Sequence, residues 1–454
     1  MTEPVGNLFR RLAAPAIIAQ LVNLLYSMVD RIYIGHYDPT GISLAGIGIC
    51  TPILMAVSAF AYLVGMGGAP RASIHMGRGE AHKAEEVLGN CFTVIVTLGL
   101  TMTGILALAG RPMLLLFGAS TETIGPAWSY LGIYLIGTVC VLLSLGMNPF
   151  ISAQGFTRIS MLSVVIGAVV NIVLDPVFIF LLDMGVKGAA AATVIAQTVS
   201  AVWILSFLCG GKTVLKIHRK NLRAKTEVII SCISLGVSPF IMNFTESVLF
   251  ICFNTSLLKY GGDIAVGSMA VLSLLMQFCF MPLSGLAQGA QPITSYNFGA
   301  GNYARVRQSF RLLLKSCMVY STSLWILAMA FPEIFVRLFN NGNPELIAYA
   351  SQMLRVYAAM LFVLGAQVAC QQTFVAIGNA KISFFLACLR KLILLIPLIY
   401  LLPLLIESHA MAVFLAEPVA DFFAVGTTVI LFAKHYRTAL SVVPADSNHQ
   451  EVRE

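Results

Sequence analysis

The hydrophobic pattern along the chain consists of long apolar stretches separated by short polar segments. Because a helix needs about 20 apolar residues to cross the hydrocarbon core of a bilayer, each of these stretches is long enough to span a membrane. The pattern predicts an all-α polytopic membrane protein with twelve transmembrane helices. They lie at approximately 13–35, 42–68, 87–109, 124–152, 159–182, 186–209, 229–259, 264–292, 310–331, 345–376, 382–405 and 409–433.

Composition supports this class of protein. Of the 454 residues, 58% are hydrophobic and 11% are charged, which is far from the composition of a water-soluble chain. The ten cysteines fall singly within apolar spans, so we expect neither a disulfide framework nor a metal site built from paired thiolates. The first residues lead directly into a full-length span without a small-residue cleavage pattern, and we therefore expect no cleavable signal peptide.

The basic residues predict how the chain crosses the membrane. An even number of spans puts both termini on one side, and with the termini in the cytoplasm 20 of the 28 Lys and Arg fall in inner segments. The outer connections hold only Arg111, Lys187, Lys259 and Arg337. This asymmetry follows the positive-inside rule and predicts cytoplasmic termini. Basic loops of this kind face anionic lipid, so we expect membrane lipids and no nucleic acid as partners.

The longest basic connection, at residues 210–226, divides the chain into equal halves. We predict an N-lobe at 1–209 with spans one to six, a cytoplasmic linker at 210–226, a C-lobe at 227–435 with spans seven to twelve, and a cytoplasmic tail at 436–454.

The two halves also resemble one another in sequence. Residues 77–83 match 299–305 at an offset of 222, and residues 155–160 match 378–383 at an offset of 223. Pro15 and Pro239 are 224 residues apart. Because each half has an even number of spans, the repeats are parallel and predict two pseudo-symmetric six-helix lobes, with a binding site between or within them.

One polar cluster interrupts the apolar fifth span. The sequence Asn171-Ile-Val-Leu-Asp175-Pro176 places an amide and a carboxylate four residues apart on one helix face, next to a residue that cannot donate a backbone hydrogen bond. An ionisable side chain deep in an apolar span costs about 2.5 to 3.5 kcal/mol, which favours a functional interpretation. The oxygens suit a proton or a small cation. The structural alternative is a neutral Asp that ties two helices together through Asn171.

Several segments together resemble the multidrug and toxic compound extrusion family. They are Pro15 leading to residues 28–35 (MVDRIYIG), residues 171–176 (NIVLDP), and residues 292–302 (PITSYNFGAGN) followed by Arg305. The resemblance covers essentially the whole chain and is strongest to the bacterial MepA-like branch of the family. It implies a V-shaped pair of lobes that exports organic cations in exchange for Na⁺ or H⁺ from the cytoplasmic (inner) membrane, with no enzyme activity and no cofactor.

The resemblance also implies a cation-coupling site in the N-lobe. It would consist of Asp30, Asn171, Asp175 and Thr193, with Asp30 and Asp175 as the metal ligands if the ion is Na⁺. Depth agrees with this assignment, since Asp175 and Thr193 each lie about seven residues, roughly 10 Å, from the outer ends of their spans. Two carboxylates held close in low dielectric cannot both stay ionised, so the pair must share a proton or hold a cation. Either a proton or Na⁺ is chemically reasonable at this site.

The C-lobe lacks a copy of this site. The repeat offsets place Asn254 opposite Asp30, Leu398 opposite Asp175 and Glu417 opposite Thr193. The remaining charges of these spans are Glu246, Arg390, Lys391, Glu417 and Asp421. Glu246 resembles a span-seven Glu of other family branches that helps to bind cation or substrate. We interpret Arg390, Lys391, Glu417 and Asp421 as a buried charge network that joins spans eleven and twelve.

Flexible thioethers and aromatic faces suit a cavity for flat hydrophobic cations. We expect substrate contacts from Glu246, Gln277, Met276, Gln367 and Tyr26. Further candidates share the same chemistry and are Met55, Met66, Met147, Met242, Met281, Phe150, Phe240, Phe244 and Phe280.

The sequence thus favours a monomeric secondary antiporter that works by alternating access. The main alternative is a flippase for a lipid-linked saccharide of the same superfamily, which usually has more than twelve spans or a cationic cavity. A membrane-embedded enzyme and an ATP-driven pump are disfavoured, because the chain has no H-E-x-x-H, no G-x-S-x-G and no Walker-type loop.

Overall fold

The computed structural model describes residues 3–38, 40–338 and 344–441, and these form helices joined by short connections. The N-terminal half contains α1 (Val5–Tyr37), α2 (Ile42–Gly77), α3 (Ala81–Leu116), α4 (Ile124–Ala153), α5 (Thr157–Pro176), η1 (Val177–Leu181), α6 (Val186–Cys209) and η2 (Arg219–Leu222). The C-terminal half contains α7 (Thr226–Gly299), α8 (Tyr303–Ala330), α9 (Pro332–Arg337), α10 (Pro344–Tyr357), α11 (Leu361–Ala376), α12 (Ala380–Cys388), η3 (Leu389–Leu395), α13 (Ile396–Leu405) and α14 (His409–Ser441).

The twelve predicted spans are present, with changes at three places. Within the described ranges, ten helices are long and apolar enough to cross a membrane, and α10 with α11 forms one more span that bends by 50°. The 74-residue α7 supplies spans seven and eight, joined at Gly262, whose φ of 65° interrupts the helix. The predicted loop at 260–263 is therefore a local break, span ten is broken instead of continuous, and span twelve extends to Ser441.

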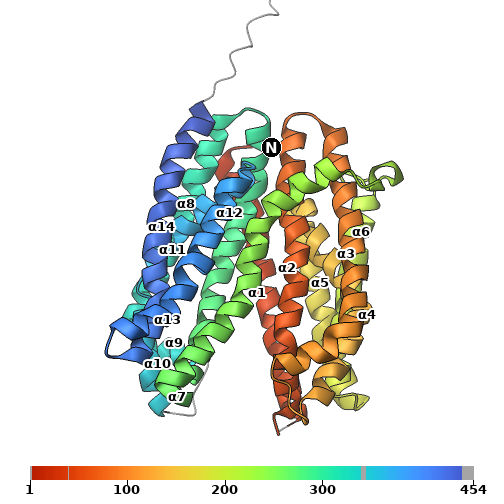
Figure 1. Ribbon diagram of the computed structural model, residues 1–454. Helices are drawn as coiled ribbons and strands as arrows, with labels where there is room; N and C mark the ends of the chain where they lie inside the picture. The colour runs from red at the N-terminus through yellow and green to blue at the C-terminus, as the bar shows by residue number, and fades with distance from the viewer. Residues whose placement is uncertain (1–2, 39, 339–343, 442–454) are drawn as a thin grey trace, which may run out of the picture.

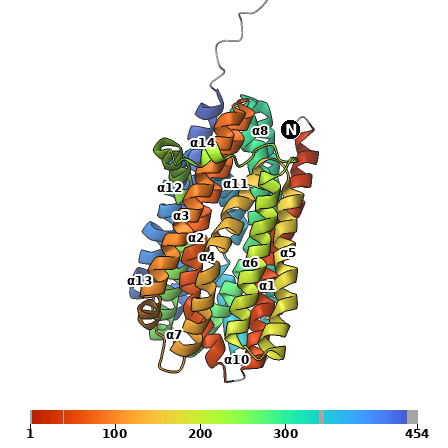
Figure 2. The same ribbon diagram turned by 90° about the vertical axis from the view of Figure 1, so that its right-hand side faces the viewer.

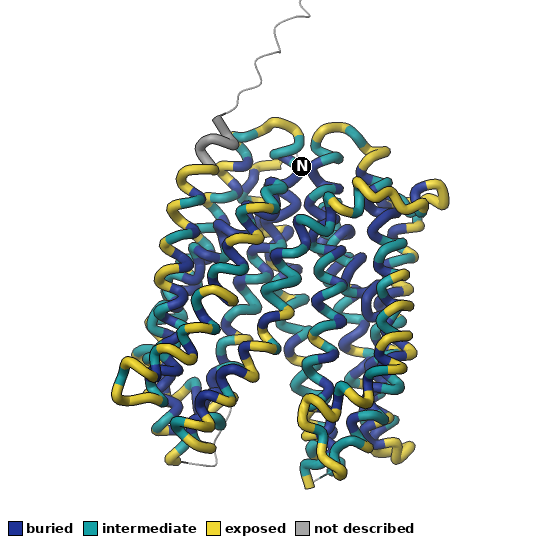
Figure 3. Tube along the Cα trace, viewed as in Figure 1, coloured by how far each residue is buried: buried dark blue, intermediate teal, exposed yellow. Residues whose placement is uncertain are grey.

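The helices form two bundles (Figures 1 and 2). We call α1–α6 the N-lobe and α7–α14 the C-lobe. The described ends of the chain lie at one end of the molecule, which is the upper end in Figure 1, and the lobes meet there. Toward the opposite end the lobes diverge (Figure 3). This is the all-α, two-lobe architecture that the repeat predicted.

Glycines let the lobes approach closely at their common end. A Cβ added to Gly67 of α2 would collide with the backbone of Cys232 and Gly236 on α7, and one added to Gly236 would collide with the Leu63 carbonyl. The two repeats also meet each other, because Gly77 abuts Tyr296 while Gly299 abuts Ile74. Such backbone contacts exclude larger residues, so small side chains close the molecule at this end.

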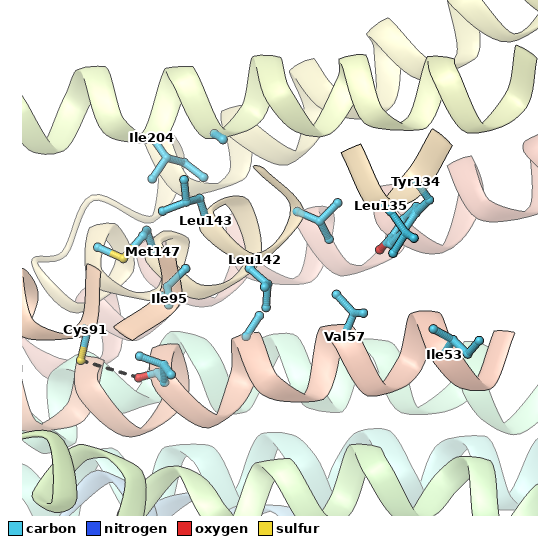
Figure 4. Packing of buried hydrophobic residues seen from close by; sticks show 14 of the residues in the cluster. Ile53, Val57, Cys91, Ile95, Tyr134, Leu135, Leu142, Leu143, Met147 and Ile204 are labelled. Carbon is cyan, nitrogen blue, oxygen red and sulfur yellow. Dashed lines mark hydrogen bonds between the residues drawn. The ribbon is translucent and has the colours of Figure 1, made fainter. Parts of the chain in front are cut away.

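Each lobe has its own apolar core. The first helix of each lobe begins in the core of the other lobe. Figure 4 shows part of the N-lobe core, where Val57 of α2, Ile95 of α3, Leu142 of α4 and Ile204 of α6 pack together. The first turns of α1, residues 5–13, belong to the C-lobe core. The start of α7, around Cys232, belongs to the N-lobe core. Each lobe thus anchors the first helix of the other at the closed end.

The linker at 210–226 packs on the N-lobe. The Gln154 side-chain oxygen accepts hydrogen bonds from the Val214 and Leu215 backbone N–H groups, at 2.8 and 2.9 Å. The Asn90 side chain accepts one from the Lys225 backbone at 2.6 Å. These bonds satisfy buried polar groups and hold the linker against the N-lobe between α6 and α7.

Candidate functional site

The polar residues of span five lie inside the N-lobe. Asn171 is 1% exposed and Asp175 is fully buried near the end of α5. Pro176 ends the α-helical part of the span, and the π-helical turn η1 follows directly. Proline removes a backbone donor, and π-helical turns are frequent where helices are adapted to a function. The sequence therefore folds locally into a buried helix face whose hydrogen bonding changes beside the carboxylate.

The side chains of this pair are only partly satisfied. Asn171 Nδ2 donates to Asp175 Oδ1 at 3.3 Å. Asn171 Oδ1, Asp175 Oδ2 and Asp30 Oδ1 are buried and have no hydrogen-bond partner. Buried polar atoms without partners are rare and cost about 1 to 3 kcal/mol each. Three such oxygens in the predicted residue set have the chemistry to accept a proton or to coordinate a small cation.

The structure brings the other predicted residues to the same region. Asp30 of α1 lies close enough to Asp175 for their charges to interact. Thr193 of α6 lies against Tyr130 of α4, which also interacts with Asp30. Within the described residues, no group of three or more His, Cys, Asp or Glu side chains is placed to hold a metal ion. The set instead offers two carboxylates, an amide and a hydroxyl, which are hard ligands for a proton or Na⁺.

A small cavity adjoins these residues. Its volume is about 40 Å³, and Tyr26, Asn171, Thr193 and Gln197 are among its lining residues. Gln197 is hydrogen-bonded to Ser144 of α4. A water needs roughly 10 to 15 Å³ of such space, so the cavity fits an ion with a few waters and excludes a drug-sized molecule. Sequence reasoning missed Gln197, although it lies one turn after Thr193 on the same face of α6.

Five charged residues of the C-lobe form three ion pairs. Arg390 Nε donates to Asp421 at 2.7 Å, and a terminal nitrogen of the same guanidinium donates to Glu417 at 3.2 Å. Lys391 Nζ donates to Glu246 Oε1 at 2.6 Å. Both basic residues come from the π-helical turn η3 in span eleven. Lys391 thus forms its ion pair with the span-seven Glu, which we did not expect, while its charge also interacts with Glu417 of span twelve.

The other predicted substrate residues do not share one pocket. Tyr26 lines the N-lobe cavity. Gln367 is buried and donates to Gln371, which in turn donates to Ser238 of α7 at 3.3 Å. Met276 packs against the C-lobe core, and Gln277 is exposed.

Among the candidate thioether and aromatic residues, Met147 and Phe150 lie in the packed core and not beside a cavity. Both are fully buried in the N-lobe core. A different group lies between the lobes, where Phe60 of α2 packs on Phe240 of α7 at 5.1 Å and Phe240 stacks with Phe244 at 5.5 Å between ring centroids. Met55 of α2 reaches Ser247 of α7 nearby.

The fold and this arrangement define a class of protein, a multi-pass membrane protein with two six-span lobes and a buried polar site in one of them. A family model, MatE, matches residues 15–177 and 239–401, one match for each repeat at an offset of 224. The chain therefore belongs to the MatE family, the multidrug and toxic compound extrusion transporters.

Individual relatives agree with this assignment. The chain is 24% identical to the multidrug export protein MepA of Staphylococcus haemolyticus, over 90% of each chain, and 23% identical to that of Staphylococcus aureus strain N315, over 88% of each. It is 34% identical to the MATE multidrug transporter DinF-BH solved in complex with R6G, with a TM-score of 0.90 over 97% of this chain and 98% of that one. A structure of MATE in complex with MaL6 has a TM-score of 0.91 at 21% identity, over 97% and 98% of the chains, and shows the same fold.

Proposed function

We propose that the protein is a secondary active multidrug efflux antiporter that exports organic cations in exchange for H⁺ or Na⁺. The observation that carries the proposal is the set of three unpaired buried oxygens on Asp30, Asn171 and Asp175. A bound Na⁺ could coordinate all three, and a proton shared by the two carboxylates would remove the charge conflict between them. The names of the MepA relatives and of the 34% identical transporter support multidrug export as the activity.

The coupling ion acts in this proposal as a co-substrate of the N-lobe. Asp30 and Asp175 supply the negative charge, while Asn171 and Thr193 supply neutral oxygens. When the ion leaves, two carboxylates remain close together in a medium of low dielectric, which is unfavourable. The protein can avoid that state by changing conformation or by taking up another ion. The N-lobe site thereby links ion occupancy to the conformational cycle.

The contact between the lobes at one end of the molecule supports an outward-open conformation. The basic inner segments predict that the end with both termini faces the cytoplasm, and the lobes meet at that end. We place the protein in a bacterial cytoplasmic (inner) membrane as a monomer with cytoplasmic termini. Transport then requires the glycine contacts of α2 with α7 to separate while the outer ends of the lobes approach.

The substrate would bind between the lobes. Phe60, Phe240 and Phe244 provide aromatic faces from both lobes, and Met55 provides a deformable thioether. Glu246 lies two residues after Phe244, and 53% of its side chain is exposed. Aromatic rings between the lobes and an exposed carboxylate on the same helix suit flat monovalent cations.

Transport in proteoliposomes tests the proposal. The purified protein is reconstituted, and movement of the fluorescent monocation rhodamine 6G is followed under an imposed pH gradient, an imposed Na⁺ gradient, or neither. Gradient-dependent movement under one of the two conditions is expected and identifies the coupling ion. Movement that is equally fast without any gradient, or its absence under both gradients in protein that binds the dye, would contradict antiport.

A further inference from the structure

The ion pair between Lys391 and Glu246 is asymmetric in its exposure. The Nζ to Oε1 distance is 2.6 Å, and the two side chains are 7% and 53% exposed, respectively. Glu246 follows Ser238 and Met242 at steps of one helical turn, and both of those residues contact Gln371 of α11. This face of α7 is directed toward the interior of the C-lobe. The ammonium therefore reaches the carboxylate from the enclosed side and leaves its other side accessible.

The cluster formed by Glu246, Arg390, Lys391, Glu417 and Asp421 has one excess negative charge. Arg390 is occupied by Asp421 and Glu417, which bind two different nitrogens of its guanidinium. Lys391 is left for Glu246. When all five groups are ionised, three carboxylates face two cations. Because two cations do not neutralise three ionised carboxylates, the cluster can accept one further monovalent cation.

The internal repeat shows what these charges replace. At the offset of 223, which matches residues 155–160 with 378–383, Arg390 and Lys391 correspond to Gly167 and Ala168. At the offset of 224, Glu417 and Asp421 correspond to Thr193 and Gln197. The four N-lobe counterparts all line the N-lobe cavity. The C-lobe thus carries fixed charges where the N-lobe has space beside its polar site.

We propose that Lys391 is a tethered counter-cation of Glu246 that a monocationic substrate displaces. This inference rests on the proposed export of organic cations and names the residue that sets their selectivity. With the site empty, the ammonium neutralises Glu246. A substrate cation takes the accessible side of the carboxylate, and the ammonium shifts to Glu417, whose charge already interacts with it. When the substrate leaves, Lys391 returns and resists rebinding.

This arrangement has two consequences for transport. A cationic substrate must compete with an ammonium already in place, so only cations with additional aromatic contacts bind well. Release toward the outside is assisted because the carboxylate is never left unpaired. Both effects depend on the positive charge at residue 391 and not on the shape of its side chain.

The test compares Lys391→Met, Glu246→Gln and the double variant in the purified full-length protein. Binding of rhodamine 6G is measured by fluorescence polarisation, and Lys381→Met, which removes an exposed lysine of α12, is the matched control. We expect Lys391→Met to bind the dye about tenfold more tightly and Glu246→Gln about tenfold more weakly. The double variant should resemble Glu246→Gln, and the control should resemble the wild type.

A charge-exchange variant provides a second test of the role of Lys391 if Lys391→Met folds poorly. Exchanging the charges, with Lys391→Glu and Glu246→Lys, preserves an ion pair but puts the ammonium at the accessible position. We expect the exchanged protein to fold and to lose dye binding. Retained dye binding there, or unchanged or weakened binding by folded Lys391→Met, would overturn the inference and make the pair a structural one. A wild-type protein that binds no cation would overturn the proposed function itself.

Discussion

Asn171 donates its side-chain amide to Asp175 one helical turn later, yet each residue keeps one buried oxygen without a partner. A pair whose role was to tie helices together would be expected to satisfy both oxygens from a neighbouring helix. Here the hydrogen bond lies within α5 and orients the two side chains. The free oxygens are therefore available to a third group, which in our account is the coupling ion.

Replacing Asn171 with Leu should weaken ion binding more than it weakens the fold. The change removes one neutral oxygen and the donor that orients Asp175, which is worth about 1 to 3 kcal/mol for a hydrogen bond to a buried charged group. The concentration of the coupling ion that gives half-maximal transport should therefore rise about tenfold. Thr198→Val is the matched control, because Thr198 donates only within its own helix. Equal effects of both changes on transport would argue against a role for Asn171 in ion binding.

Replacing Gly236 with Ala should open the end of the molecule at which the lobes meet. The added Cβ would collide with the Leu63 carbonyl of α2, and backbone atoms cannot move aside as a flexible side chain can. We expect the population to shift toward a conformation in which the outer ends approach each other. Spin labels at Ser120 and Glu407, both exposed in outer connections of different lobes, should report a shorter distance.

The matched control for this experiment is Gly104→Ala. Gly104 lies in α3 with open space around its Cα, so the added methyl group meets nothing. The control should give the distance distribution of the unmodified protein. A Gly236→Ala protein with that same distribution would show that the contact between α2 and α7 does not hold the inner end closed.

The inner turn after α2 should depend on pH through Glu80. Hydrogen bonds from Lys83 and His75 lower the pKa of Glu80 from its ordinary value to about 2. The stabilisation of this turn is therefore fully present above the unfolded pKa, about 4.3, and is lost as the pH falls toward 2. Glu80→Gln should reduce the protection of residues 78–84 against backbone hydrogen exchange at pH 6, and the difference from the wild type should shrink at pH 3. A difference of the same size at pH 6 and pH 3 would contradict this account.

The span pattern and the repeat were sufficient to predict the architecture. Long apolar stretches determine helices in a membrane, because every backbone group must be satisfied within the span. The matched glycine motifs indicated the two lobes, and in the structure Gly77 and Gly299 lie at the contact between the repeats. The break at Gly262 and the bend in span ten were not predictable, since apolar composition does not specify where a helix bends.

Asn171 and Asp175 could be named as candidates because a carboxylate and an amide are conspicuous in an apolar span, whereas Asp30 and Thr193 were named through the family resemblance. The partner of Lys391 could not be predicted from the sequence. Sequence proximity and charge balance favoured the acids of span twelve, whereas the fold places Lys391 against Glu246 of span seven. Which of several acids a buried base meets depends on the rotation of each helix about its own axis, and an apolar pattern with little periodicity does not determine that rotation.

The most direct test of the account is uphill efflux by Asp175→Asn measured beside equilibrium dye binding in the same purified protein. The amide keeps the shape of the side chain but removes one of the two negative charges, so the empty variant site carries the single negative charge that the wild-type site has with one ion bound. Thermal stability should be close to that of the wild type, because a neutral amide at this depth costs no more than a protonated acid. The account predicts retained rhodamine 6G binding with loss of gradient-driven accumulation. Normal gradient-driven efflux by Asp175→Asn would contradict it and would leave Asp175 as a residue that joins helices.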